Sequence, residues 1–338
     1  MRKIFLALAV TALAASGCQR EDFGSNQHSG PEVRFAAAME PIDLPAGSLG
    51  ATRGTPVFDQ SDILEMRVFA FEAANEATAV PDFMDNQLVS RSSSTAPWTY
   101  SPKKYITDGA TVNFYAYTPS ATNNYSVGNP TGNGIVCAGH SVGLPPLRYT
   151  VPERCENQPD LMVAVPVIGI TSDDGSVLFQ MKHTLTCVGF QVSGSGQRIK
   201  SIGISGVSVA GTLNGMNGSA IVWNNLDPAT TTDFTASLNY DAGENYYTAT
   251  PTMSTTLLTG SGYLMMIPQT LGTDAKLTVT FTDNSTEEFS LSGFPNWTAG
   301  GKITYNISLT PPAVISVSPQ GVIIPQTGTV SPSTYSFD

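Results

Sequence analysis

The sequence predicts an all-β, exported protein. Of its 338 residues only 13% are charged, against a usual fraction of about 25% in soluble domains. Apolar and polar residues alternate with period two along many short segments, which is typical of strands with one buried face. No segment carries a convincing helical period for more than a turn or two. Because 41% of the residues are hydrophobic, the chain can bury a sizeable core, which argues against simple disorder. The low charge and the 31 glycines and 23 prolines exclude a coiled coil or a helical array, which need stretches rich in Ala, Glu, Lys, Leu and Arg.

Three segments show the alternation most clearly. In each of them the apolar side chains occupy every second position, which places them on one face of a sheet. The apolar sets are Val112, Phe114 and Ala116, then Leu277, Val279 and Phe281, then Ile303, Tyr305, Ile307 and Leu309. We expect these segments to be antiparallel strands of a β-sandwich.

The segment from Val177 to Val192 changes phase along its length. Its apolar residues lie at odd positions up to Cys187 and at even positions from Val188. Because a slip of one residue moves the apolar set to the other face of a sheet, the segment must contain a β-bulge or a bend. Gly189 is a residue at which such an irregularity would be tolerated.

Turn residues divide the chain into two parts. Asp173-Asp174-Gly175 follows an apolar stretch and precedes the next strand, so we place the boundary between two β domains there. The predicted organisation is a signal peptide (1–17), a tether (18–31), an N-terminal β-sandwich (32–172), a C-terminal β-sandwich (173–312) and a tail (313–338).

The N-terminus has the features of a lipoprotein signal peptide. Arg2 and Lys3 precede an apolar run over residues 4–15, which is too short for a permanent membrane span. The following Ala15-Ser16-Gly17-Cys18 matches the bacterial lipobox, so Cys18 is predicted to carry lipid and to anchor the protein to a membrane. The net charge of −11 argues against a nucleic-acid partner, because it would repel phosphate.

Three cysteines remain after Cys18. Cys137 and Cys155 flank a Gly/Pro-rich loop and are candidates for a disulfide in an oxidising compartment. Cys187 lies on the apolar face of a strand and is interpreted as a small buried hydrophobic residue. Because the chain has no CxxC and only three histidines, we expect no metal site and no cofactor.

Two catalytic motifs are missing from the sequence. It contains no HExxH and no phosphate-binding loop, so we do not expect an enzyme. His183 falls in register with Phe179 and is interpreted as a core histidine. Trp98, Trp223 and Trp297 leave an alternative open, a surface glycan-binding lipoprotein. A coplanar, exposed pair of tryptophans would favour that function, whereas burial would favour packing.

The tail contains two apolar, β-prone pieces separated by Pro319-Gln320-Gly321. One interpretation is an edge strand packed on its own domain. The other is a strand intended for another molecule. The residues concerned are Val314, Ile315, Val317, Val322 and Ile324.

Short motifs follow one another in order over nearly the whole mature chain. In the first half these are the lipobox at Cys18, Glu32-Val33-Arg34-Phe35-Ala36-Ala37-Ala38, Ala51-Thr52-Arg53-Gly54, Pro97-Trp98-Thr99-Tyr100 and Val112-Asn113-Phe114-Tyr115-Ala116-Tyr117. In the second half they are Gln158-Pro159-Asp160-Leu161-Met162, Phe179-Gln180-Met181-Lys182-His183-Thr184-Leu185, Tyr263-Leu264-Met265-Met266-Ile267-Pro268-Gln269 and Trp297-Thr298-Ala299-Gly300-Gly301-Lys302-Ile303-Thr304-Tyr305. In this order they resemble the Bacteroidetes fimbrillin family, the major-fimbria-like lipoproteins that build type V pili.

The resemblance implies two tandem transthyretin-like antiparallel β-sandwich domains and the role of a structural pilus subunit. It implies that an early strand, with Val33, Phe35 and Ala37, completes the N-terminal sandwich of the precursor. An extracellular Arg-specific protease would cut between Arg53 and Gly54, and the early strand would leave. The tail strand of the next subunit, over about residues 313–324, would then fill the groove by β-strand addition.

The partners implied by the resemblance are other pilin subunits in a head-to-tail homopolymer, a lipid anchor, the protease and an adhesion target that the sequence does not identify. The precursor would lie in the cell outer membrane as a lipoprotein, and the mature subunit in the surface fimbrium. Proline cannot donate to a strand ladder, so Pro319 indicates a shorter exchanged segment than in stalk pilins. A tip or adhesin subunit of the same pilus is the alternative left open.

Overall fold

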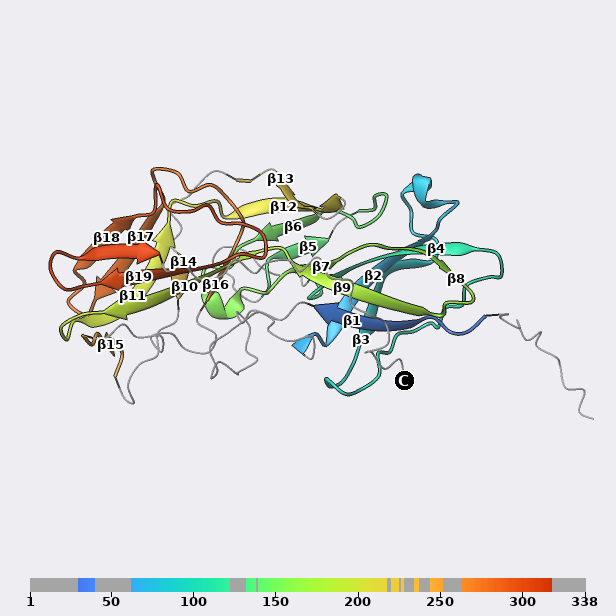
Figure 1. The fold of residues 1–338 in the computed structure, drawn as a ribbon, viewed down its shortest axis with the longest axis horizontal. Helices are drawn as coiled ribbons and strands as arrows, with labels where there is room; N and C mark the ends of the chain where they lie inside the picture. The colour runs from blue at the N-terminus through green and yellow to red at the C-terminus, as the bar shows by residue number, and fades with distance from the viewer. Residues whose placement is uncertain are drawn as a thin grey trace, which may run out of the picture.

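The computed structural model of the chain shows an elongated molecule built almost entirely of β-strands (Figure 1). It describes residues 30–39, 62–121, 132–137, 139–217, 220–224, 226–227, 234–236, 244–251 and 263–317. In these ranges the complete helical elements are two 3₁₀ turns, η2 (Glu76–Thr78) and η3 (Cys155–Asn157). The predicted all-β fold class is therefore confirmed.

The largest sheet has seven strands and lies toward one end of the molecule (Figure 1). Six of its strands are hydrogen-bonded in the order β1 (Arg34–Met39), β9 (Ser176–His183), β7 (Met162–Ala164), β4 (Thr111–Thr118), β2 (Glu65–Glu72) and β3 (Met84–Ser90). The seventh, β8 (Val167–Thr171), pairs with β4. β1 runs parallel to β9, whereas the other pairings of this sheet are antiparallel.

Three smaller sheets make up the rest of the molecule. The first has the order β13 (Ala220–Asn224), β12 (Ala210–Asn217), β6 (Leu147–Thr150) and β5 (Ile135–Cys137). The second has the order β16 (Leu264–Met266), β10 (Thr186–Ser193), β19 (Lys302–Ser308) and β20 (Val314–Val317). The third has the order β14 (Phe234–Ala236), β11 (Arg198–Ser205), β17 (Lys276–Phe281) and β18 (Thr286–Ser290), with β15 (Tyr247–Thr248) pairing with β11.

The buried side chains form two hydrophobic cores. One face of the seven-stranded sheet contributes Phe35, Phe114 and Phe179 to the first core. The second core is larger, contains side chains from the three smaller sheets, and also receives Phe69 and Tyr117 from the other face of the large sheet. The alternation predicted for Val112, Phe114 and Ala116 thus describes β4, whose two faces belong to different cores.

The predicted change of phase between Val177 and Val192 is a bend between two strands. β9 ends at His183 and β10 begins at Thr186, and the two strands belong to different sheets. Gly189 is not the site of the irregularity, because it lies inside an unbroken pairing of β10 with β19. A Cβ at Gly189 would lie 2.7 Å from the ring of Tyr263, so close packing explains the glycine there.

The turn expected at the domain boundary is present. The Oδ2 atom of Asp174 accepts hydrogen bonds from the backbone N and the Oγ1 of Thr171, and Gly175 has a φ of +57°. This turn connects β8 to β9, two strands of the same seven-stranded sheet. In addition, β6, which precedes residue 173, pairs with β12, which follows it. Strands from before and after residue 173 therefore occur together in two sheets, the seven-stranded sheet and the sheet that contains β6 and β12.

Candidate functional site

β1 is an edge strand whose residues are nearly all buried. Its backbone pairs with β9 from Arg34, opposite Ser176, to Met39, opposite Met181. The five residues after Arg34 are each at most 9% exposed. An edge strand usually leaves part of its surface to solvent, so this burial makes β1 an integral part of the first core.

Phe35 is the central side chain of β1. Its ring stacks on that of Phe179 in β9, with centroids 5.9 Å apart and planes inclined by 5°. It also meets the rings of Tyr100 and Phe114 edge-on, at centroid distances of 5.3 and 6.0 Å. Aromatic contacts at these distances add stabilisation beyond the area they bury. Removing β1 would therefore expose the rings of Tyr100, Phe114 and Phe179 to the space that Phe35 fills.

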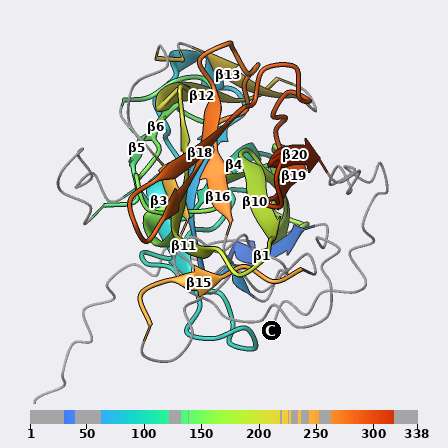
Figure 2. The same cartoon turned by 90° about the vertical axis from the view of Figure 1, so that its left-hand side faces the viewer.

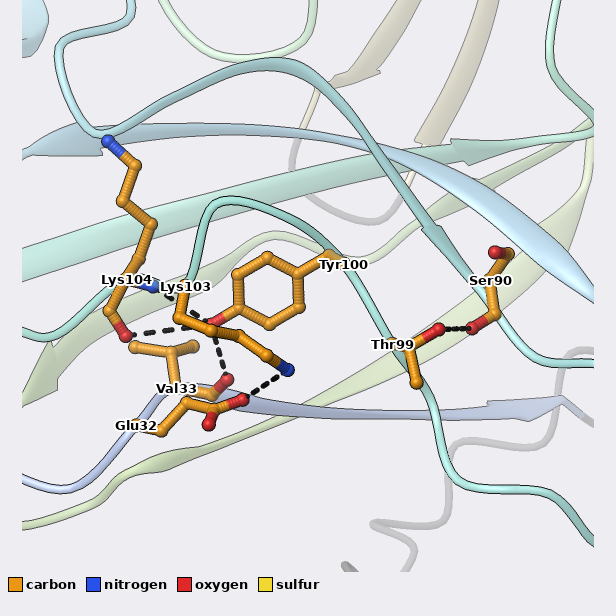
Figure 3. A network of polar contacts seen from close by, with 7 residues as sticks. All are labelled: Glu32, Val33, Ser90, Thr99, Tyr100, Lys103 and Lys104. Atoms are coloured by element: carbon orange, nitrogen blue, oxygen red, sulfur yellow. Dashed lines mark hydrogen bonds and ion pairs between the residues drawn. The ribbon is translucent and has the colours of Figure 1, made fainter.

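The loop between β3 and β4 crosses from one edge of the sheet to the other, because β3 and β1 are its two edge strands. At one end Thr99 is fixed to Ser90 of β3 by two backbone hydrogen bonds of 2.7 and 2.9 Å and by its Oγ1, 3.1 Å from the Ser90 carbonyl oxygen (Figure 3). At the other end Tyr105 forms an isolated bridge with Glu32. We call residues 99–105 the crossing segment.

The crossing segment binds the two residues that precede β1 (Figure 3). The Val33 N donates to the Lys104 carbonyl oxygen at 3.0 Å, and the Tyr100 hydroxyl donates to the Val33 carbonyl oxygen at 2.7 Å. That hydroxyl also accepts a hydrogen bond from the Lys104 N. The Lys103 ammonium lies 2.6 Å from the Glu32 carboxylate. Burial raises the pKa of Tyr100 to about 12, so its hydroxyl stays protonated and donates at neutral pH.

Comparison with known families decides what kind of chain this is. A family model described as fimbrillin-like matches residues 52–332. The chain belongs to the fimbrillin-like family. The resemblance inferred from the sequence motifs is confirmed. No curated protein matches the chain.

Solved structures share the fold of this fimbrillin-like chain. A protein described as a cell adhesion protein from Bacteroides ovatus aligns with a TM-score of 0.56 and 14% identity, over 86% of this chain and 96% of its own. A fimbrial protein from Bacteroides vulgatus aligns with a TM-score of 0.54 and 17% identity, over 85% and 97%. A cell adhesion protein of Bacteroides uniformis also gives 0.54, with 14% identity over 86% and 97%.

The structure brings together the residues predicted for the early strand of the fimbrillin-like chain. Phe35 and Ala37 lie in β1, and Val33 immediately precedes it; all three belong to the first core. The predicted lipidation site Cys18 and the predicted cleavage site Arg53–Gly54 lie outside the described residues. Val322 and Ile324 of the tail also lie outside them.

The described part of the tail pairs with its own chain. β20 contains Val314, Ile315 and Val317 and pairs antiparallel with β19. Figure 2 shows β20 beside β19 at the outside of the molecule. Val314 is 54% exposed, whereas Ile315 packs against the second core. This arrangement agrees with the edge-strand interpretation of the tail.

The cysteines considered for a disulfide are present as thiols. Cys137, in β5, is half-buried and Cys155, in η3, is buried, and the structure does not join them. Cys187 is 3% exposed and belongs to the second core, and burial raises the pKa of its thiol. Its predicted place on the apolar face of a strand therefore matches the structure.

His183 is a core residue, as its register with Phe179 predicts. Its imidazole is 7% exposed, and its Nδ1 lies 2.8 Å from the Oδ2 of Asp160, a carboxylate whose side chain is fully buried. His183 ends β9, and Asp160 lies just before β7, the strand that pairs with β9. The next residue after His183, Thr184, is buried as well. His183 and Asp160 form a buried polar pair within the fold and not a solvent-accessible reaction site.

The three tryptophans are held by internal contacts. The Trp297 indole is 2% exposed and donates to the Tyr305 hydroxyl, and the Trp223 indole donates to the Thr184 carbonyl oxygen. Trp98 is partly buried, with the guanidinium of Arg91 4.8 Å from its ring centroid. These positions favour packing over the coplanar, exposed pair that glycan binding requires.

The roles of Tyr100 and Lys103 were not apparent from the sequence. Tyr100 closes the motif Pro97-Trp98-Thr99-Tyr100, so a local signal existed, but its hydroxyl bonds to a residue 67 positions earlier. Among the described residues no group of three or more His, Cys, Asp and Glu side chains is arranged to hold a metal ion. Nor does any helix in the described ranges reach the length and apolarity of a membrane span.

Proposed function

We propose that the chain is a structural subunit of a cell-surface pilus that polymerises by exchanging β1 for a strand of another subunit. The observation that carries this proposal is the position of β1. It is a buried edge strand, and it is joined to the rest of the chain through residues 40–61, which contain Arg53 and Gly54. Membership of the fimbrillin-like family and the fold shared with fimbrial proteins support the proposal.

A cut between Arg53 and Gly54 leaves β1 held only by non-covalent contacts. When β1 departs, β9 becomes the edge of the sheet and its outer backbone groups lose their partners. The rings of Phe114 and Phe179 lose their contact with Phe35 at the same time. An open edge beside an apolar groove favours the addition of an extended segment, because backbone hydrogen bonds and side-chain pockets are both available.

The incoming strand is the tail of a second copy, over about residues 313–324. Among the described residues the tail pairs on one side only, with β19, and exposes Val314. Its transfer to a neighbouring subunit breaks the pairing with β19 and the packing of Ile315 against the second core. Because the groove and the tail are different surfaces of the chain, the contact is heterologous and generates a filament.

Export and anchoring complete the proposal. The precursor is made as a lipoprotein through Cys18 and lies in the outer membrane, where an extracellular Arg-specific protease reaches Arg53. Cleavage after Arg53 also separates the lipid-bearing fragment from the mature subunit, which then joins the surface fimbrium. A tip or adhesin subunit of the same pilus would share these steps but would end the fibre.

Proteolysis of the purified precursor tests the proposal. A chain lacking residues 1–17 is incubated with an Arg-specific protease and examined for SDS-resistant ladders. We expect ladders from the wild type, and none from Arg53→Ala or after deletion of residues 313–338. Arg148→Ala is the matched control, because Arg148 is 62% exposed and lies outside both segments. A wild type that is not cut near residue 53, or is cut without forming ladders, contradicts the proposal.

A further inference from the structure

The backbone N–H groups of Val33 and Arg34, at the start of β1, donate hydrogen bonds to two different segments. The Arg34 N donates toward the β9 side, to the Gly175 carbonyl oxygen at 2.9 Å, whereas the Val33 N donates to Lys104. Successive backbone N–H groups of an extended chain point to opposite sides. The start of β1 is therefore held on both sides at once, by the turn before β9 and by the crossing segment.

We propose that the crossing segment is a clamp that sets how long β1 stays in its groove after cleavage, with Tyr100 and Lys103 as its positioning residues. This inference rests on the proposed function and concerns the rate and direction of the exchange. The clamp holds the end of β1 that is remote from the cut, since residues 40–61 follow Met39. Displacement of β1 accordingly begins at Met39 and proceeds toward Val33.

Tyr100 joins the backbone and the side-chain contacts of the clamp. Its hydroxyl binds the Val33 carbonyl oxygen, while its ring meets the ring of Phe35 edge-on. β1 therefore cannot move out of the groove without breaking both contacts. Replacing Tyr100 by phenylalanine removes the hydroxyl and leaves the ring, so the packing of the core is preserved.

Lys103 adds an electrostatic contact at the surface. Its ammonium pairs with Glu32 and lies 4.7 Å from the ring centroid of Tyr100. The side chains of the pair are 42% and 35% exposed, so dissolved salt screens their attraction. The lifetime of β1 in its groove should therefore shorten as ionic strength rises.

Release of the N-terminal fragment from the nicked chain tests the clamp. The nick is made at Arg53 or, independently of that residue, at another protease's recognition sequence placed over residues 51–54. We expect Tyr100→Phe to release the fragment about five-fold faster than the wild type, the effect of losing one hydrogen bond. We expect about two-fold for Lys103→Gln, which should also abolish the response to salt.

Two matched variants control for general effects. Tyr115 lies on the face of β4 opposite to Phe114, and Tyr115→Phe removes a hydroxyl that donates a hydrogen bond to Glu76. Lys276→Gln breaks an exposed ion pair with Glu288. Both should release the fragment at the wild-type rate. If Tyr100→Phe and Lys103→Gln release it no faster than these controls, the clamp proposal is wrong.

Hydrogen exchange in the uncut chain separates the clamp from polymerisation. In Tyr100→Phe we expect the amides of β1 to exchange about five-fold faster and those of β17 to be unchanged. Equal acceleration of both strands, or of neither, overturns the clamp. If the amides of β1 respond as expected but the cut wild type forms no ladders, the clamp stands and the proposed function fails.

Discussion

The ring of Phe35 stacks on the ring of Phe179 across the parallel pairing of β1 with β9. The two residues are far apart in sequence, and one of them lies on a strand that the proposed maturation removes. The stacked pair therefore couples the integrity of the first core to the presence of β1. The first core is therefore complete only while β1 is in place.

Truncation of Phe35 measures this coupling. We expect Phe35→Ala to lower the free energy of unfolding of the uncut chain by about 3–5 kcal/mol, because a buried aromatic ring is lost and a cavity remains. Urea denaturation followed by circular dichroism gives the value. Glu287→Ala, at an exposed position of β18, is the control and should change it by less than about 0.5 kcal/mol. Equal midpoints for the two variants would contradict a core role for β1.

The buried pair of His183 and Asp160 can be compared with an exposed pair of the same chemistry. His140 and Asp85 are 3.1 Å apart, and their side chains are 39% and 49% exposed. Asp160→Asn and His183→Gln should each lower the free energy of unfolding by about 1.5–3 kcal/mol, and the double variant by less than their sum, because the two share one buried contact. The equivalent double-mutant cycle on His140 and Asp85 should give a coupling free energy of about 0–1 kcal/mol. A coupling free energy that is larger for the exposed pair than for the buried pair would contradict this prediction.

Alkaline pH should destabilise the fold over the range in which its buried tyrosines ionise. Burial raises the pKa of Tyr100, Tyr263 and Tyr305 to about 12 from the ordinary value of 10.0. The folded state thus holds these phenolic protons more tightly than the unfolded state. Their contribution is fully present below pH 10 and is lost as the pH rises from 10 toward about 12.

Urea midpoints across this range, together with the ultraviolet absorbance of phenolate, follow both events. Tyr305→Phe removes one of the three groups, so its stability should fall less steeply with pH than that of the wild type. The same slope in both chains would mean that Tyr305 does not contribute. Because Tyr305 also accepts a hydrogen bond from Trp297, this variant should be less stable than the wild type at neutral pH.

Local patterns in the sequence predict the strands, but they do not predict contacts between residues that are distant in sequence. The alternation at Val112, Phe114 and Ala116 predicts β4 because successive side chains of a strand point to opposite faces of the sheet. It carries no information on the parallel pairing of Phe35 with Val177, which joins two remote segments. For the same reason the hydrogen bond from Tyr100 to Val33 was not predicted.

The change of phase before Val192 is an intermediate case. The sequence correctly predicts an irregularity, since the apolar positions slip by one. Its location was wrong because glycine was taken as the weak point, whereas β9 and β10 separate at Thr184 and Leu185. Gly189 is present for another reason, the close approach of Tyr263, which only the folded structure shows.

Two glycines with positive φ should differ sharply in their tolerance of a side chain. Gly134 has a φ of +75°, and a Cβ there would overlap the carbonyl oxygen of Thr150, whose N–H donates to the Gly134 carbonyl. Gly109 has a φ of +79°, but nothing lies within 4 Å of the position of its Cβ. Gly109→Ala should therefore cost about 1–2 kcal/mol, the backbone strain alone. Gly134→Ala should cost clearly more, since β5 and β6 must also separate locally, and urea denaturation of the two variants measures the difference. Equal losses would show that the contact with Thr150 relaxes freely.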